Sequence, residues 1–529
     1  MQKLLVLSVG VALMGMCVSG YAELQNVTVG GQIEIRGRYH HSTFTTGLAP
    51  EVRVPAGWLR GRPTGGPAVS IVDWDNRGTE WTFAESAVSL NVGADFTDNV
   101  SSFIEFYSYD YWGEDFRSSY VTGGDGRGNW VTGNGSVDDV EVLQAYIQAE
   151  EVFGYPLRVR IGRQTMKFGK GWQVDDKTTP TQRQGFDAIR LTYTPTDDIE
   201  IDAWWAKLAD TSPAEKDGDV DFYGIHGTYS GIEAVNLSAY WMFIRDARSI
   251  APEFNRGFVG EWLEDMVGVD DYDPTQLHSV GMRAWGNYAS FDYDLELTYQ
   301  FGEADRYGSM MQPVVFGYGD NDADFGNWGL DVEVGYNFDV KYSPRVFIGG
   351  AWLEGEDNRD ITFGEWLGSY FNPFYQRDAS VNFNRMFSNI NYCPAFQDNA
   401  WMSNFKQIRI GGSIKPTDKT WVMLRVQKLW SDEPFDWPAH FEWNGNRIPY
   451  APFLSFWTEE ADDDLGYSTC LIAKYNYSPD LTFIFYWGHM FCGDGAYEGS
   501  YSFFNGTMFN GGTDDDDADY AFFWIINKF

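Results

Sequence analysis

Residues 291–302 read FDYDLELTYQFG, and apolar and polar side chains alternate along them with a period of two. In an extended strand the two faces would carry Tyr293, Leu295, Leu297 and Tyr299 on the apolar side and Asp294, Glu296, Thr298 and Gln300 on the polar side. The same alternation recurs in residues 26–40 and 328–337. It predicts strands that separate an apolar environment from a polar one.

Eighteen such segments follow one another along the chain. Their approximate centres are Ile33, Ser86, Phe106, Ala145, Val159, Arg190, Ala203, Ile225, Ala239, Met282, Leu297, Val332, Ile348, Ile410, Leu424, Leu471, Phe485 and Trp524. Short connections such as 96–99 and 416–419 follow the even strands, and long Gly- and Trp-rich ones such as 42–78, 246–275 and 355–404 follow the odd strands. This rhythm predicts an all-β, transmembrane, antiparallel up-and-down β-barrel of eighteen strands, with short periplasmic turns and long extracellular loops.

The composition agrees with a membrane barrel and excludes some functions. The 529 residues carry a formal net charge of −38, which argues against binding nucleic acid. Aromatic residues make up 17%, as expected if they form girdles at two membrane interfaces. Beyond the N-terminus no apolar stretch is long enough for a spanning helix, so a closed barrel is the remaining way to cross a membrane. A secreted soluble all-β protein is the alternative.

Both ends of the chain carry export signals. Residues 1–22 read as a signal peptide, with Lys3 before the apolar run 4–16 and a small-residue cleavage site at 20–22, which leaves residues 23–529 for the barrel. The last strand, DYAFFWIINKF (519–529), ends on an aromatic residue and resembles the strand that barrel-assembly machinery recognises. We therefore expect the bacterial outer membrane as location, and outer-membrane lipid, lipopolysaccharide and the assembly machinery as partners.

Three segments carry a resemblance to a known family. They are LRVRIGRQTMKFGKG (157–171), FDAIRLTY (186–193) and GQIEIRGRY (31–39). They resemble the alginate-export family of outer-membrane barrels, which implies an eighteen-stranded barrel and, less directly, alginate as substrate. Two positions depart from the family pattern: Lys170 replaces an acidic residue between two glycines, and Ala188 replaces a glycine.

Charged residues on the strands are assigned to the lumen, because a charge on the lipid face would cost about 2–4 kcal/mol at mid-membrane. For Arg163, a bulge after Gly162 would be needed to turn the side chain inward. The predicted pore-lining residues are Arg36, Arg38, Arg158, Arg160, Arg163, Arg190, Arg283, Arg409, Arg425, Glu296 and Glu333. Further acids assigned to the interior are Glu34, Glu85, Glu105, Glu200, Asp202, Asp294 and Asp331.

The arginines concentrate on the first, fifth, sixth, fourteenth and fifteenth strands, and the acids on the seventh, eleventh and twelfth. This distribution predicts a basic wall facing an acidic wall across the lumen, and a modest preference for anions or uronates. The alternative is that the arginines only pair with lumen acids and keep the barrel rigid.

The function expected from these features is a porin that lets small or oligomeric, anionic solutes diffuse passively. The sequence has neither HExxH nor GxSxG, so neither an enzyme nor a cofactor is expected. A surface-display barrel, whose long loops bind a partner or a carbohydrate, is the alternative.

Two further features leave their interpretation open. Acidic residues gather in loops, where they are either solvated or bind Ca²⁺, and they are Asp320, Asp322, Asp324, Asp514, Asp515, Asp516 and Asp517. Beyond the signal peptide the cysteines are Cys393, Cys470 and Cys492, which export would allow to form one disulfide.

Overall fold

The computed structural model describes most of the chain. The described residues are 26–41, 80–112, 140–177, 181–210, 219–247, 274–303, 306–307, 319–320, 324–355, 381–393, 403–434, 436–438, 440–443, 446–449, 458–460, 462–495 and 517–529. The predicted signal peptide and the loop 42–78 lie outside them. Among the described residues, no helix is long and apolar enough to cross a membrane.

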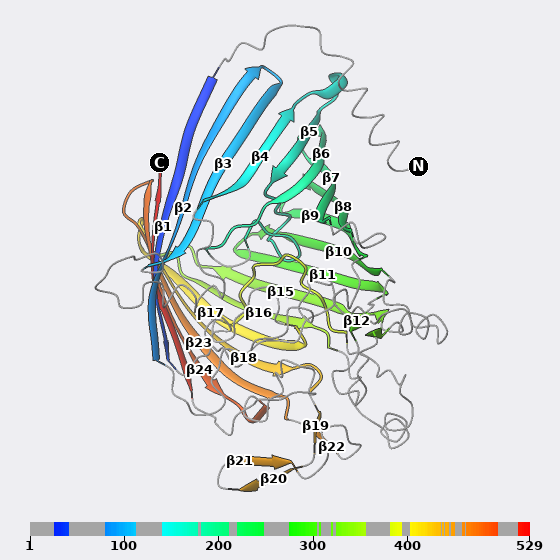
Figure 1. The fold of residues 1–529 in the computed structure, drawn as a ribbon. Helices are drawn as coiled ribbons and strands as arrows, with labels where there is room; N and C mark the ends of the chain where they lie inside the picture. The colour runs from blue at the N-terminus through cyan, green and yellow to red at the C-terminus, as the bar shows by residue number, and fades with distance from the viewer. Residues whose placement is uncertain are drawn as a thin grey trace, which may run out of the picture.

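Eighteen antiparallel strands form one closed barrel (Figure 1). They are β1 (Asn26–His41), β2 (Glu80–Thr97), β3 (Val100–Tyr111), β4 (Glu141–Ala149), β5 (Leu157–Gln164), β6 (Phe186–Thr196), β7 (Ile199–Ala209), β8 (Val220–Ile232), β9 (Val235–Asp246), β10 (Thr275–Tyr288), β11 (Phe291–Glu303), β15 (Trp328–Asn337), β16 (Arg345–Leu353), β17 (Phe405–Thr417), β18 (Thr420–Ser431), β23 (Asp464–Asn476), β24 (Leu481–Cys492) and β25 (Ala518–Lys528). Each predicted strand centre falls within one of them, so the fold prediction is confirmed.

Shorter elements lie in the connections. They are the 3-10 turn η2 (Val152–Gly154) and the short strands β12 (Arg306–Tyr307), β13 (Gly319–Asp320), β14 (Asp324–Phe325), β19 (Asp436–Pro438), β20 (His440–Trp443), β21 (Asn446–Pro449) and β22 (Thr458–Glu460). Two-residue turns join β2 to β3, β6 to β7, β8 to β9, β10 to β11, and β17 to β18. These turns all lie at the end of the barrel opposite the long connections, as predicted.

The first and last strands of the barrel, β1 and β25, pair with each other and close the ring. β1 pairs with β25 from Gln32↔Lys528 to His41↔Asp519, and β1 lies beside the C-terminus in Figure 1. Beyond the last strand, the Gly31 amide donates to the Phe529 carbonyl at 2.9 Å, and the Phe529 amide donates to the Gly31 carbonyl at 3.1 Å. Because each of the eighteen strands has two neighbours, the barrel wall has no free edge.

The two faces of the wall differ as the alternation predicts. Outward-facing Met282 and Ile410 are 61% and 59% exposed, although both are apolar. The inward-facing neighbours Glu296 and Arg409 are polar and buried. Such an inside-out arrangement needs an apolar solvent around the barrel.

The three cysteines beyond the signal peptide lie among the described residues and are present as thiols. Cys393 and Cys470 are buried, and Cys492 is partly buried. The disulfide that export would allow is therefore not formed between them.

Candidate functional site: a lumen crossed by two inner segments

The connection between β5 and β6 runs through the interior of the barrel. We call residues 165–177 and 181–185 the first inner segment. Near its start, Lys170 reaches acids on β11 and β15. Near its end, the Thr181 hydroxyl accepts a hydrogen bond from Arg36 of β1 at 3.2 Å, and Arg183 pairs with Glu105 of β3 at 2.5 Å. The segment therefore crosses from one side of the wall to the other.

A second inner segment, residues 381–393, comes from the long connection between β16 and β17. It joins the first segment through a parallel bridge between Val174 and Phe387. The indole nitrogen of Trp172 also donates a 2.7 Å hydrogen bond to the Tyr392 hydroxyl. Since Trp172 and Phe383 are fully buried and stacked with ring centres 5.8 Å apart, the two segments support each other inside the lumen.

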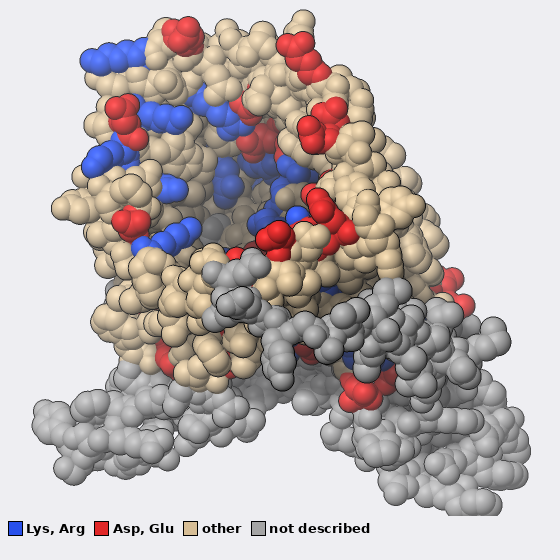
Figure 2. Space-filling view, turned by 90° about the horizontal axis from the view of Figure 1, so that it is seen from above, with Lys and Arg blue, Asp and Glu red and all other residues tan. Residues whose placement is uncertain are grey.

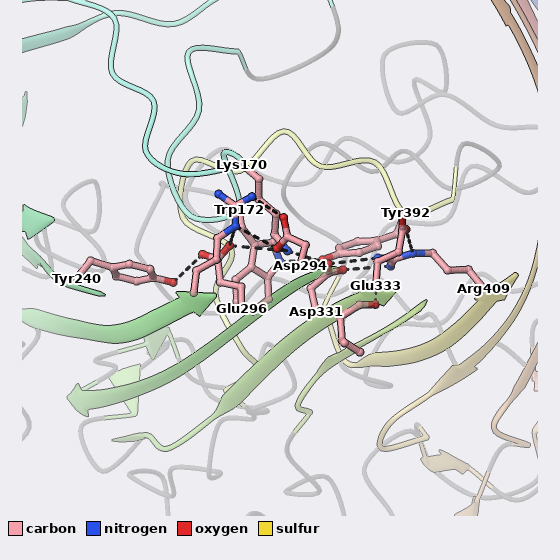
Figure 3. A network of polar contacts seen from close by, with 11 residues as sticks. Lys170, Trp172, Tyr240, Asp294, Glu296, Asp331, Glu333, Tyr392 and Arg409 are labelled. Carbon is pink, nitrogen blue, oxygen red and sulfur yellow. Dashed lines mark hydrogen bonds and ion pairs between the residues drawn. The ribbon is translucent and has the colours of Figure 1, made fainter. Parts of the chain in front are cut away.

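Nine charged side chains on the wall of the lumen and the first inner segment are linked by ion pairs, and Figure 3 labels Lys170, Asp294, Glu296, Asp331, Glu333 and Arg409 among them. We call this network the charge ladder, and its members are Arg283, Asp294, Glu296, Lys170, Asp331, Arg409, Glu333, Arg345 and Asp292. All except Lys170 come from the strands β10, β11, β15, β16 and β17.

Lys170 occupies the centre of the charge ladder. Its ammonium group lies 2.8 Å from Asp331, 3.4 Å from Asp294 and 3.7 Å from Glu296. Arg283 donates to Asp294 at 3.0 Å, and the Tyr240 hydroxyl donates to Glu296 at 3.1 Å. One cation from the first inner segment thus joins the acids of two neighbouring strands.

Arginines complete the ladder toward β16 and β17. Arg409 donates to Asp331 at 3.1 Å and to Glu333 at 3.0 Å, although β16 lies between their strands. Gly349 of β16 makes this reach possible, because a Cβ there would lie only 2.9 Å from Nε of Arg409. Arg345 lies 2.9 Å from Glu333 and also pairs with Asp292, so it links these two acids.

A second ionic cluster lies near the barrel closure. Fully buried Glu85 of β2 binds Arg36, and it lies 3.4 Å from Arg38. The Tyr109 hydroxyl donates a 2.6 Å hydrogen bond to the same carboxylate. One carboxylate therefore holds two arginines of β1.

The arginines of β5 and β6 are less completely neutralised. Arg158 pairs with Glu150 at 2.8 Å, and Arg190 pairs with Asp202 at 2.8 Å. Arg160 instead donates to the side-chain oxygen of Gln148 at 2.6 Å, and its guanidinium lies 4.3 Å from the Tyr146 ring centre. Among the described residues no carboxylate lies within ion-pair distance of Arg160.

Figure 2 shows a hollow in one face of the molecule, and Lys, Arg, Asp and Glu side chains gather within it. Ten of the eleven predicted pore-lining residues lie on the inward parity of their strands, the exception being Arg163. The predicted separation into a basic and an acidic wall is wrong on this side of the lumen. There, arginines from β10, β16 and β17 interleave with the acids of β11 and β15, because long guanidinium side chains reach across strands.

The inward direction predicted for Arg163 is also wrong. The alternation continues unbroken through Gly162, so that Arg163 pairs in register with outward-facing Ala145. Its side chain is 39% exposed and lies 3.4 Å from Asp187 on the outer face of β6. The bulge that would turn it inward is not formed.

The first inner segment carries a buried carboxyl group, that of Asp175. Asp175 is buried, and burial together with the nearby Asp176 raises the pKa of its carboxyl above the ordinary value, although Lys167 lies 2.7 Å away. A buried carboxylate of this kind is disfavoured in its charged form.

The acidic loops show no metal site in the part of the chain that is described. Asp322, Asp514, Asp515 and Asp516 lie outside it, whereas Asp320, Asp324 and Asp517 lie within it. Among the described residues, no group of three or more His, Cys, Asp or Glu side chains could hold a metal ion. Calcium binding stays a prediction.

Sequence reasoning missed the inner segments, the residues Lys170, Trp172 and Tyr392 that hold them, and Arg345 of the wall. Only one of these gave a signal, since Lys170 stood out as a departure from the family pattern. Because the lumen contains many acids, a lysine such as Lys170 in a connection that enters the lumen would be expected to form an ion pair with one of them.

The fold and interior define the class of protein: an antiparallel barrel with an apolar outside and a charged lumen is a transmembrane channel of the porin type. Comparison with family models gives a match to "Alginate export" over residues 89–501, which is well over half of the chain. The chain belongs to the alginate export family. It is a porin of the bacterial outer membrane and not an enzyme, as predicted from its sequence.

Among solved structures, the barrel is similar to OccK8 (OprE) of Pseudomonas aeruginosa, with 9% identity, a TM-score of 0.46, and coverage of 95% of this chain and 98% of that one. It is also similar to OccAB1 of Acinetobacter baumannii, with 10% identity, a TM-score of 0.49, and coverage of 95% and 96%. No curated protein matches the sequence. Membrane lipid and small solutes are its partners, whereas contacts with lipopolysaccharide and with the assembly machinery stay predictions.

Proposed function

We propose that this porin prefers anionic solutes, and uronates in particular. The preference comes from Arg160 and Arg190, which lie directly opposite each other on β5 and β6 and both face the lumen. Like charges in directly opposed positions repel each other, so such a pair is costly to maintain. A passing carboxylate would relieve this repulsion, because guanidinium groups bind carboxylates through two hydrogen bonds.

The surroundings of the pair support this proposal. Asp202 neutralises Arg190, but the neighbours of Arg160 are an amide and an aromatic ring, which leave its charge uncompensated. The charge ladder on the other side of the lumen holds its own charges in ion pairs. The family name points in the same direction, since alginate is a polymer of uronic acids and carries one carboxylate on each sugar.

The test is ion selectivity in planar bilayers. A charge 4 Å from an ion contributes about 1 kcal/mol in water. Arg190 is already paired with Asp202, so Arg160→Ala plus Arg190→Ala removes about one such uncompensated charge and should lower the chloride-to-potassium permeability ratio by about two- to fivefold at low salt. Lys341→Ala plus Lys419→Ala removes the same charge from two short turns and should leave the ratio unchanged. An unaltered reversal potential in the arginine double variant would refute the proposal.

A further inference from the structure

The apolar outer face of the barrel is not equally tall on all strands. On β11 every outward residue from Phe291 upward is apolar or aromatic until Glu303 is reached. On β5 the outward residues are apolar only from Leu157 to the position below Arg163. Twelve residues separate the first pair and six the second. At about 3.3 Å per residue and a strand tilt of about 40°, these lengths correspond to about 30 Å and about 15 Å of barrel height.

The low stretch of the outer face carries two charges where lipid is expected. Asp187 of β6 lies directly opposite Arg163 in the strand register, and both face outward. We call these two residues the outer notch. Since the lipid-facing apolar band of such a barrel is about 25 Å tall, the outer notch lies roughly 10 Å below its upper boundary. Charges at this depth are costly in hydrocarbon, so the outer notch requires a neighbour other than lipid tails.

The path of the chain explains why the outer face is low here. β5 ends at Gln164, and the chain then leaves the wall to form the first inner segment. It returns to the wall at Phe186, where β6 begins. The two strands therefore cannot extend their apolar outer faces upward as β10 and β11 do.

The two charges of the outer notch keep binding capacity for a further partner. Arg163 and Asp187 lie 3.4 Å apart, and their side chains are 39% and 60% exposed. The Arg163 Nε is buried and has no hydrogen-bond partner among the described residues. A lipid phosphate would attract the guanidinium but would be repelled by the exposed carboxylate beside it. A protein surface that carries both signs satisfies both groups.

The outer notch is complementary to itself. Because Arg163 and Asp187 are register partners on neighbouring strands, their heights in the membrane differ by only about 3 Å. A two-fold rotation about the membrane normal keeps these heights and exchanges the two sides. It therefore places Arg163 opposite Asp187 of the partner subunit, and Asp187 opposite the partner's Arg163. Below them Ile161 and Leu191 are 42% and 39% exposed and supply apolar surface for the same contact.

We propose that the outer notch is the centre of a dimer interface, and that its occupant is a second copy of this porin. Two ion pairs across the two-fold axis neutralise the charges that lipid would leave unsolvated. The apolar residues below them pack against their counterparts. This inference goes beyond the proposed anion preference, because it concerns the outer face and involves no residue of the lumen.

The experiment is site-directed cross-linking of the porin in lipid vesicles with a short bismaleimide. Ile161→Cys places a thiol beside the proposed axis. Ile410→Cys is the matched control, since Ile410 is an outward isoleucine of β17 that is 59% exposed. The cysteines already present beyond the signal peptide are common to both variants. A cross-linked dimer should form with Ile161→Cys and not with Ile410→Cys.

Charge reversal then tests the ion pairs within the Ile161→Cys protein. Arg163→Asp or Asp187→Arg alone sets like charges against each other across the axis. Each should lower the cross-linked fraction by about tenfold. The two reversals together restore opposite charges and should restore the dimer.

Two results would overturn the dimer interface. Equal cross-linking at Ile161→Cys and Ile410→Cys would mean that lipid covers the outer notch. Undiminished cross-linking in both single reversals, once heat-modifiable migration has shown that they fold, would mean that the charges do not hold the contact. The chloride-to-potassium ratio is measured independently, so failure of the dimer leaves the anion preference standing.

Discussion

Replacement of Lys170 by Gln would remove a cation that joins the first inner segment to the acids of β11 and β15. The Lys170 side chain is 17% exposed, and its ammonium lies within 4 Å of three carboxylates. Removing one partner of a buried ion pair costs about 3–5 kcal/mol. Asp294 and Asp331 keep Arg283 and Arg409, so we expect the loss to be nearer 2–3 kcal/mol. The ratio of docked to undocked segment should then fall by about 30- to 150-fold.

Single-channel recordings would measure this change directly. Lys170→Gln should give more frequent openings to a higher conductance level, because the segment leaves the lumen more often. Lys419→Gln is the control: it removes the same charge from an exposed position in the turn between β17 and β18, outside the charge ladder and the inner segments. If both variants open equally often, the charge ladder does not hold the segment, and the reasoning fails.

Three further predictions follow from the wall and the inner segment. Glu85→Gln leaves Arg36 and Arg38 without their shared carboxylate, and should lower barrel stability by about 3–5 kcal/mol, seen as unfolded gel migration at a lower temperature. Ile410→Lys places a charge on the lipid face and should cost about 2–4 kcal/mol in urea titrations of vesicle-inserted protein; a cost near zero would contradict the assigned orientation. The raised pKa of Asp175 means that docking of the first inner segment is strongest below the ordinary carboxyl pKa and weakens as pH rises through the raised value. Openings should therefore become rarer on acidification, and Asp175→Asn should abolish that dependence.

The wall of the barrel could be predicted from the sequence because its information is local. Each strand separates lipid from lumen, so one face must be apolar, and the period of two then gives both the strand and the direction of its side chains. Arg163 illustrates this rule. Simple alternation correctly gives the outward direction of its side chain, whereas the bulge that was expected to turn it inward does not form. The length of the connections gives the remaining information, namely which end carries the turns.

The interior could not be predicted in the same way, since its contacts join residues far apart in the chain. Lys170 meets Asp331 across 161 positions, and Trp172 meets Tyr392 across 220. No local pattern shows that a connection enters the lumen. The ion pair between Arg409 and Asp331 depends on a glycine in the intervening strand, and that dependence appears only when the three strands lie side by side.

The hydrogen bonds between Gly31 and Phe529 have a consequence for biogenesis. They belong to a seam whose two halves are separated by nearly the whole chain, and chain segments so distant in sequence meet slowly. Until β1 pairs with β25, both edge strands of the sheet have unpaired backbone amides and carbonyls, and exposing these groups to hydrocarbon is energetically costly. The unpaired edges of folding intermediates of this porin must therefore be kept out of contact with the lipid hydrocarbon, and pairing of β25 with β1 is the step that closes the barrel.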